Sequence, residues 1–164
     1  MILSTNNKQS TGKIHVNTKN NLSKLNNIYI NSAYALGIDE IDLETSSTKS
    51  IDLSQNIGFT IMNQKNNILK IKDISGLGQE NAEEIFKRVF QLIISFYESA
   101  IDNIINNQNA DENTINNIDS EINKFVLFLQ RSIMKQNNID ETSGKILFAY
   151  SFGLEHIGDE ISRM

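Results

Sequence analysis

The sequence contains no cysteine, no proline and no tryptophan. Without cysteine the chain has neither disulfides nor thiolate metal ligands, so a metal ion would be held by oxygen ligands or by one of the two histidines. No apolar run approaches the roughly 18 residues that a membrane-spanning helix needs. Residues 1–6 also lack the basic and apolar regions of a signal peptide. We therefore expect a cytoplasmic protein without a transmembrane segment.

Common catalytic motifs are absent as well. The chain has no Gly-x-Ser-x-Gly nucleophile elbow and no Gly-x-x-x-x-Gly-Lys-Ser/Thr phosphate-binding loop. Gly76 and Gly78, separated by one residue, supply only part of the Gly-x-Gly-x-x-Gly motif that binds dinucleotides. These absences favour a protein that is not an enzyme.

The 164 residues, 39% of them hydrophobic, suffice for one or two domains, and their charge is unevenly divided. Residues 1–73 carry eight basic and six acidic side chains, a net charge of +2. Residues 75–164 carry seven basic and fourteen acidic side chains, a net charge of −7, which completes the −5 of the whole chain. Because nucleic acids are bound largely through Lys and Arg, the acidic part is a poor surface for them and suits cations or a basic protein surface.

The first part of the chain predicts a small α+β domain over residues 13–74, after a loose terminus over 1–12. Gly37 follows a run of apolar residues at helical spacing, and glycine commonly ends a helix in this way. The predicted elements are, in order, a strand over 13–17, a helix over 20–36, a strand over 38–43, a short helix over 51–58, and a β-hairpin with strands over 59–62 and 67–73.

Two glycines at 74–78 interrupt the strand pattern, and beyond them the sequence predicts an antiparallel three-helix bundle over residues 75–164. Asp111 and Asp140 are placed as N-caps of the second and third helices. Apolar residues recur at steps of three and four, as in heptad seams. The expected helices are 79–107, 112–136 and 141–164, and their seams are Phe86, Phe90, Ile93, Tyr97, Ala100 and Ile104; Ile115, Ile118, Ile122, Phe125, Leu129 and Ser132; and Leu147, Tyr150, Leu154, Ile157, Ile161 and Met164.

The last helix contains a pair of acids that predicts a candidate metal site. Glu155 and Asp159 are four residues apart, so a helix places both carboxylates on one face, where a cation would relieve their repulsion. In an antiparallel pair that turns near residue 139, Asp119 lies level with Asp159, since each is 20 residues, or about 30 Å, from the turn. Asn123 then lies opposite Glu155.

On the second helix, the residues that face this candidate metal site are therefore Asp119 and Asn123, with Glu121 near by. Oxygen ligands from two helices suit hard cations such as Mg²⁺, Ca²⁺, Mn²⁺ or iron, and Zn²⁺ also accepts carboxylates.

Other interpretations of these residues stay open. Carboxylates four residues apart commonly lie on a solvated helix face, and Asp119 is also explained as an acid stabilised by a helix N-terminus. His156 is an exposed residue, a metal ligand or a phosphate acceptor of a phosphotransfer bundle. Phe128 and Phe148 lie off the seams and predict an exposed apolar patch for a partner protein or a homodimer.

The order and spacing of two motifs resemble the PhoU family of phosphate-uptake regulators. They are Leu-Glu-His-Ile-Gly-Asp-Glu-Ile over 154–161 and Asp-Ser-Glu-Ile-Asn over 119–123. The likeness covers roughly residues 20–164 and is closest to the archaeal branch, in which one such bundle follows a small α+β region. Residues 33–39 look like the helix-Gly-strand element of that region, and residues 68–73 look like its closing strand.

The resemblance implies a regulator of phosphate transport and phosphate signalling that binds metal ions on acidic helical motifs. The implied ligands are Glu155, Asp159, Asp119 and Asn123, and the implied partner is a phosphate transporter or its sensor proteins. Asn123 stands where the family has a second acid. The family's basic DNA-binding domain has no counterpart in residues 1–12, and the helix ends five residues after Asp159, so we expect a piece of a longer protein. The alternative is a metal-free helical module for interaction or oligomerisation.

Overall fold

The computed structural model describes residues 12–18, 25–47, 51–76, 81–106, 112–136 and 140–164. Within them the chain is an α+β protein with a four-stranded mixed sheet and four helices, which confirms the α+β part of the prediction. The strands are β1 (Lys13–Asn17), β2 (Glu40–Glu44), β3 (Phe59–Lys65) and β4 (Ile68–Asp73). The helices are α1 (Leu25–Ala35), α2 (Ala82–Ile105), α3 (Glu112–Lys135) and α4 (Glu141–Ser162).

The sheet has the strand order β1-β2-β4-β3. β1 and β2 are parallel, and α1 forms the crossover between them, whereas β2, β4 and β3 pair antiparallel. The predicted hairpin is confirmed as β3 and β4. Its tip is Asn66-Asn67, whose φ angles of 52° and 62° are those of a type I′ turn.

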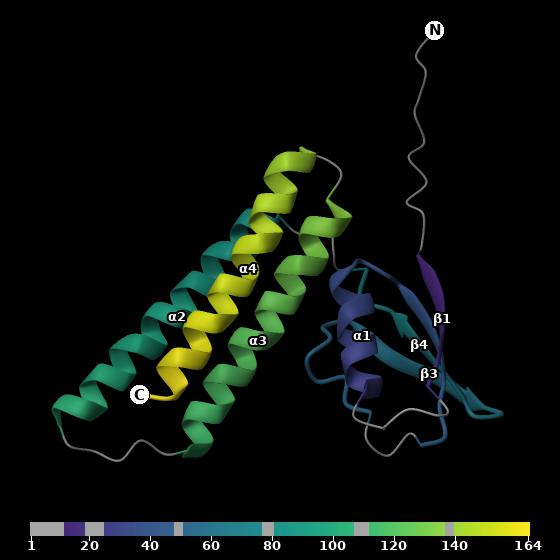
Figure 1. Ribbon diagram of the computed structural model, residues 1–164, viewed down its shortest axis with the longest axis horizontal. Coiled ribbons are helices and arrows are strands. Elements are labelled where there is room, and N and C mark those ends of the chain that lie inside the picture. Colours follow the sequence, from purple (N-terminus) through teal and green to yellow (C-terminus); the bar gives the residue numbers. More distant parts are fainter. Residues whose placement is uncertain (1–11, 19–24, 48–50, 77–80, 107–111, 137–139) are drawn as a thin grey trace, which may run out of the picture.

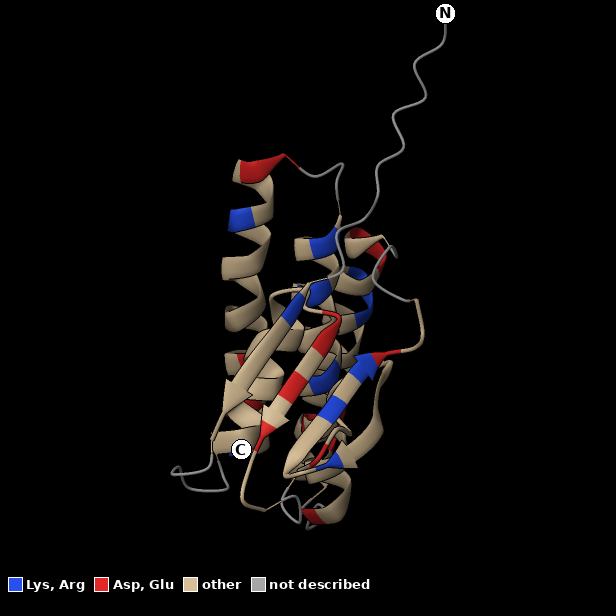
Figure 2. Ribbon diagram, turned by 90° about the vertical axis from the view of Figure 1, so that its right-hand side faces the viewer, with Lys and Arg blue, Asp and Glu red and all other residues tan. Residues whose placement is uncertain are grey.

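The two faces of the sheet differ in chemistry. Ile41, Leu43, Leu69 and Ile71 are buried on one face. On the other face Lys13 pairs with Glu40 and Asp42 of the neighbouring strand, and Lys70 pairs with Glu40 from the opposite side. Figure 2 shows these acidic residues of β2 between basic residues of β1 and β4. The sheet therefore buries only its apolar face, against α1 and the helices beyond it.

The prediction of a short helix over 51–58 is wrong, because this segment forms turns. The Asp52 carboxylate accepts a hydrogen bond from the Ser54 backbone N–H at 2.8 Å, and Gly58 has a φ of +89°. Both features bend the backbone locally and prevent helical continuation. The expected helix start at 20–24 lies outside the described residues.

The three long helices pack against one another, and α1 lies on the outer side of α3 (Figure 1). Asp140 is the N-cap of α4, as predicted, and accepts hydrogen bonds from the N–H groups of Thr142 and Ser143. Asp111 lies outside the described residues. None of the helices in the described ranges is long and apolar enough to cross a membrane.

The predicted seams are rotated from the observed buried faces of two helices. In α2 the buried residues are Ala82, Ile85, Val89, Ile93 and Phe96. Phe90 and Tyr97, placed in the predicted seam, are 49% and 50% exposed. In α4, Leu154 and Ile161 are buried as predicted and Leu147 is partly buried, whereas Tyr150, Ile157 and Met164 are exposed. The apolar arc of each helix is wider than the face that its neighbours cover, so spacing alone did not locate the buried edge.

Phe128 is buried rather than part of an exposed patch, with 4% of its surface accessible. The reason is that α3 is covered on two sides, by α1 and by the other two long helices. The same double cover buries Arg131, whose side chain is inaccessible to solvent.

Arg131 connects α3 to the sheet and to α1. Its guanidinium group donates hydrogen bonds to the backbone oxygen of Ile38 at 2.7 Å and to the Asp73 carboxylate at 2.8 Å, and it also pairs with Asp39. It lies 4.8 Å from the ring centroid of Tyr34. The bundle and the α+β unit therefore share a buried ionic centre and one continuous core.

Candidate functional site

The helices α3 and α4 approach closely at the level where the sequence predicts a site. Gly158 of α4 is buried, and a Cβ atom added there would lie 3.3 Å from Cγ2 of Ile122 on α3. Such a distance is tight for carbon atoms, so glycine is what allows this approach. The candidate ligands flank the contact, because Ile122 lies between Asp119 and Asn123 in α3, and Gly158 lies between Glu155 and Asp159 in α4.

The four predicted residues, Asp119, Asn123, Glu155 and Asp159, meet at this level and are called the acidic cluster below. The Asn123 amide donates a hydrogen bond to Oδ2 of Asp119 at 3.2 Å. Across the helix pair, Asp119 is close enough to both Asp159 and Glu155 for electrostatic repulsion. This proximity and the contact of Gly158 with Ile122 agree with the register counted from the sequence.

The electrostatics of the acidic cluster favour an added positive charge. Burial and the neighbouring Asp159 carboxylate raise the pKa of Asp119 above its ordinary value, although the Asn123 hydrogen bond and the charge of Arg163 act in the other direction. Burial, Asp159 and Asp119 likewise raise the pKa of Glu155. A bound cation would reverse both shifts, because it stabilises the ionised carboxylates.

Two oxygens of the cluster also lack hydrogen-bond donors. Oδ1 of Asp119 and Oδ1 of Asn123 are buried and have no hydrogen-bond partner. Leaving a buried acceptor unsatisfied costs about 1–3 kcal/mol, so both atoms favour a ligand that accepts their lone pairs. Carboxylate and amide oxygens are the donor types that hard cations prefer.

The side chains do not form a finished coordination shell. Within the described ranges, no group of three or more His, Cys, Asp or Glu side chains lies close enough together to hold a metal ion. The residues present nevertheless fit a hard cation by the chemistry of their donors, namely three carboxylates and the orphaned amide oxygen of Asn123. The ligand set implied by the family resemblance therefore stays a prediction.

The structure also bears on the roles expected for Asp119 and Glu121. α3 begins at Glu112, so Asp119 is about two turns inside the helix, and the N-terminal dipole falls off within the first turn. The helix dipole therefore does not account for Asp119. Glu121 is exposed and pairs with Lys124, so it does not join the cluster.

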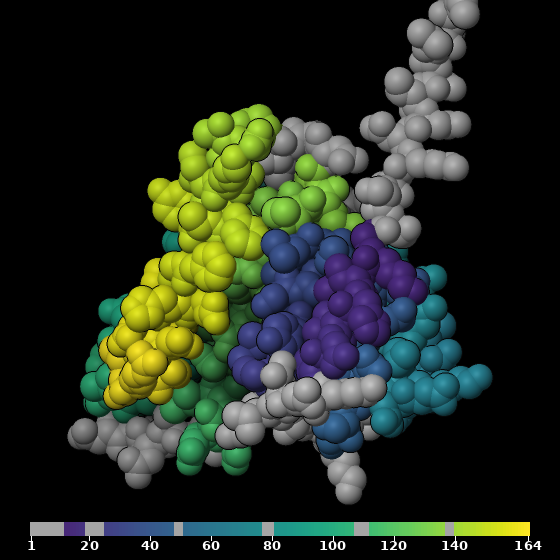
Figure 3. Space-filling view, turned by 45° about the vertical axis from the view of Figure 1, so that its right-hand side comes forward, coloured from purple at the N-terminus to yellow at the C-terminus, as the bar shows by residue number. Residues whose placement is uncertain are grey.

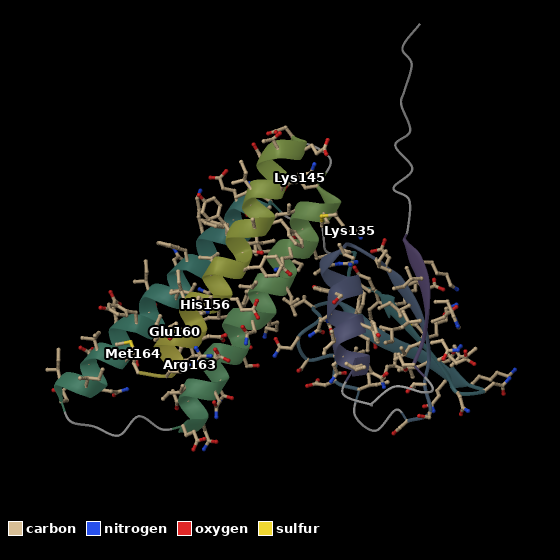
Figure 4. The ribbon with its side chains drawn as sticks, in the orientation of Figure 1. Lys135, Lys145, His156, Glu160, Arg163 and Met164 are labelled. Carbon is tan, nitrogen blue, oxygen red and sulfur yellow. The ribbon has the colours of Figure 1, made fainter. Side chains whose placement is uncertain are left out.

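His156 lies on the exposed side of α4. Its side chain is 72% exposed, and Nε2 is 3.9 Å from the Glu160 carboxylate. Figure 4 shows His156, Glu160 and Arg163 along the last turns of this helix, where Arg163 pairs with Glu160. A phosphate-acceptor role for His156 has no further support from these contacts.

Sequence analysis missed a groove that begins at the acidic cluster. It has a volume of about 630 Å³ and lies between α1 and α4, with α3 as its floor. In Figure 3 it is the hollow between α4 and α1. We call it the α1–α4 groove, and its apolar lining includes Ile28, Leu36, Leu127, Phe148 and Phe152. Phe148 and Phe152 are one helical turn apart, and this spacing was the available sequence signal.

Arg131 was also missed. The available signal was a single arginine within residues 125–133, a largely apolar stretch of helix. An exposed arginine would be unusual in such a stretch.

Comparisons with known proteins do not assign the chain to a family. No family model matches it, and neither a curated protein nor a solved structure does.

Proposed function

We propose that this chain is a non-enzymatic, PhoU-like regulator of phosphate transport and phosphate signalling. It binds a divalent or trivalent metal ion on the acidic cluster and docks a phosphate transporter or one of its sensor proteins. The observation that carries the proposal is the meeting of Asp119, Asn123, Glu155 and Asp159 across two helices. The order of the motifs along the chain, which resembles that of the PhoU family, supports it.

The carboxylates of Asp119, Glu155 and Asp159 and the amide oxygen of Asn123 would hold the cation. The cation supplies positive charge and Lewis acidity, and it restrains the helix pair. Without the cation, burial and the repulsion between these groups raise the pKa values of Asp119 and Glu155. Binding therefore links local cation concentration to the rigidity of the surface formed by α3 and α4.

A metal-free helical module for interaction or oligomerisation is the second candidate. Exposed aromatic side chains favour it, because Phe90 and Tyr97 of α2 are half exposed one above the other on one helix face. In this alternative the carboxylates of the acidic cluster are only hydrated surface groups where α3 meets α4.

Isothermal titration of the purified, metal-free protein with MnCl₂ distinguishes the two candidates. We expect binding by the unmutated protein, and at least tenfold weaker binding by the double variant Glu155→Gln/Asp159→Asn. The matched control is Glu160→Gln, which removes an acid from the same helix outside the cluster and should bind like the unmutated protein. No heat of binding, or equal loss in the control, would exclude the cation site.

The phosphate role is tested in cells by replacing the chromosomal gene with the same double variant. We expect phosphate uptake at high external phosphate to change in the same direction as in a deletion strain, while Glu160→Gln behaves like the unmutated strain. Uptake that is identical in the deletion and unmutated strains at low and high phosphate would contradict a role in phosphate transport.

A further inference from the structure

The α1–α4 groove presents apolar side chains that the described part of the chain leaves open. Ile28 of α1 and Leu36, which directly follows α1, are each 57% exposed, and Phe152 of α4 is 54% exposed. Phe148 and Phe152 contact each other edge to face, with ring centroids 5.6 Å apart. These side chains form two apolar walls over a floor that includes Leu127. The cost of leaving them in water favours an apolar occupant.

One end of the groove is lined by hydrogen-bond acceptors. Glu155 is its single charged residue, and beside it lie Asn123 and Gln55. The Gln55 amide nitrogen donates to the Ser120 hydroxyl at 2.8 Å, but its Oε1 is buried without a donor, as is Oδ1 of Asn123. Two unpaired acceptors and a carboxylate are complementary to a cationic group with several N–H donors. Lys and Arg side chains are such groups.

The groove also has the shape of a helix-binding site. It is an open trough between two helices, and amphipathic helices bind such troughs through residues spaced at i, i+3, i+4 and i+7. Its acidic end disfavours anionic lipid headgroups and nucleic acid phosphates, which carry the same sign of charge.

We propose that the α1–α4 groove binds an amphipathic helix of a partner protein through apolar side chains packed on Phe148 and Phe152 and one Lys or Arg bonded to Glu155, Asn123 and Gln55. The inference rests on the proposed function and names the chemistry of the docking partner. Glu155 and Asn123 belong to both the groove and the acidic cluster. A metal ion and the basic side chain therefore compete for the same oxygens, and cation binding releases the partner.

The test begins with a phage-displayed library of amphipathic helices, selected on the metal-free protein in EDTA. We expect the selected helices to carry a Lys or Arg at one end of the apolar face. A fluorescein-labelled selected peptide and its copy with that residue changed to Met are then compared by fluorescence anisotropy. The change to Met should weaken binding at least tenfold. Selected helices without a basic residue, or equal affinities for the two peptides, would overturn the proposal.

Three variants locate the bound peptide. Glu155→Gln should remove most of the difference between the two peptides, and Phe152→Ala should weaken both at least tenfold. Tyr150→Ala is the matched control, because Tyr150 is an exposed aromatic residue of α4 outside the groove, and binding should not change. All three side chains are at least partly exposed, and circular dichroism verifies that the variants fold. Loss of binding in Tyr150→Ala but not in Phe152→Ala would place the peptide elsewhere and overturn the proposal.

Manganese separates this inference from the proposed function. Adding MnCl₂ to the peptide complex should lower the apparent peptide affinity at least fivefold. If the protein binds Mn²⁺ in the calorimeter but selects no helix, the groove proposal fails and the cation site stands. If it selects a basic helix but binds no Mn²⁺, the cation site fails and helix docking stands. Sedimentation of the free protein tests the remaining occupant, because a dimer that Phe152→Ala dissociates would show a second copy in the groove and overturn the proposal.

Discussion

Helix α3 carries two charged sites, 12 residues or about 18 Å apart, that differ in how their charges are balanced. At Arg131 a fully buried cation is surrounded by the carboxylates of Asp39 and Asp73 and by backbone oxygens. At Asp119 the charges of Asp159 and Glu155 across the helix pair have the same sign, and the hydrogen bond from Asn123 leaves Oδ1 of Asp119 without a donor. The charges of the first site are balanced within the chain, although Nε of Arg131 has no hydrogen-bond partner, and the charges of the second site are not balanced.

This difference separates a structural site from a candidate binding site. The pKa of Asp73 illustrates the balanced site: burial alone would raise it, but hydrogen bonds from Ser75 and Arg131 hold it below its ordinary value. The pKa of Asp119 is raised, because burial and Asp159 outweigh the contribution of Asn123. A group whose charge is disfavoured in the folded chain is a candidate for contact with a ligand of opposite charge.

Arg131→Met should give the largest effect, because it leaves the carboxylates of Asp39 and Asp73 buried with less compensating charge. We expect the free energy of unfolding to fall by about 3–5 kcal/mol, as when one partner of a buried ion pair is removed. Urea denaturation measures this loss. The control Arg88→Met, at an exposed position of α2, should change it by less than about 0.5 kcal/mol. Equal stability of both variants would show that the Arg131 site is not structural.

Two glycines of α4 test the close approach at the acidic cluster. Gly153→Ala should stabilise the protein by about 0.5–1 kcal/mol, since alanine favours helix and a Cβ there meets nothing within 4 Å. Gly158→Ala has the same helical preference but places its Cβ 3.3 Å from Ile122, so it should be less stable than Gly153→Ala by about 1 kcal/mol. Thermal unfolding compares the two. Equal gains would mean that α3 and α4 are not closely packed at this level.

Neutralising one acid in each site should change stability in opposite directions. The raised pKa of Asp119 means that its ionised form costs stability above that pKa, so Asp119→Asn should be more stable than the unmutated protein at pH 7. The gain is less than about 1 kcal/mol, because the group is only partly buried and solvent screens its charge, and it vanishes as the pH falls below the ordinary value of 3.8.

Asp73→Asn is the opposite case. The lowered pKa of Asp73 contributes stability above its ordinary value, and this contribution is lost as the pH falls through the folded-state pKa. The variant should therefore be less stable than the unmutated protein at pH 7. Urea denaturation at pH 7 and pH 3 measures both variants, and a change of the same sign in both would remove the distinction between the two sites.

Local signals were sufficient to predict the α+β class, the hairpin and the start of α4. Alternation in β4 and the Asp140 cap act within a few residues, so the sequence expresses them directly. The sequence also predicted that Asp119 and Asp159 lie at the same height on the two helices. Because the rise per residue of a helix is constant, the position of the connection between two antiparallel helices fixes which residues lie side by side. Counting along the chain therefore located the acidic cluster.

Features that depend on distant contacts were not predictable in this way. Arg131 reaches Asp39 and Asp73, which are 92 and 58 residues away in the sequence. The α1–α4 groove and the burial of Phe128 both depend on where α1 lies on α3. The spacing of apolar residues predicted that α2 and α4 are helices. It did not predict which of their apolar residues are buried, because neighbouring elements decide which part of each helix is covered.

Carboxyl-carbon NMR of the ¹³C-labelled protein, titrated with and without MgCl₂, compares the two sites in one experiment. In the metal-free protein we predict that Asp119 and Glu155 titrate above their ordinary values of 3.8 and 4.5, and that Asp73 titrates below 3.8. Mg²⁺ should lower the pKa values of Asp119 and Glu155 and leave that of Asp73 unchanged. Asp119 and Glu155 titrating at or below their ordinary values, with no response to Mg²⁺, would contradict the account of an unbalanced, cation-binding site.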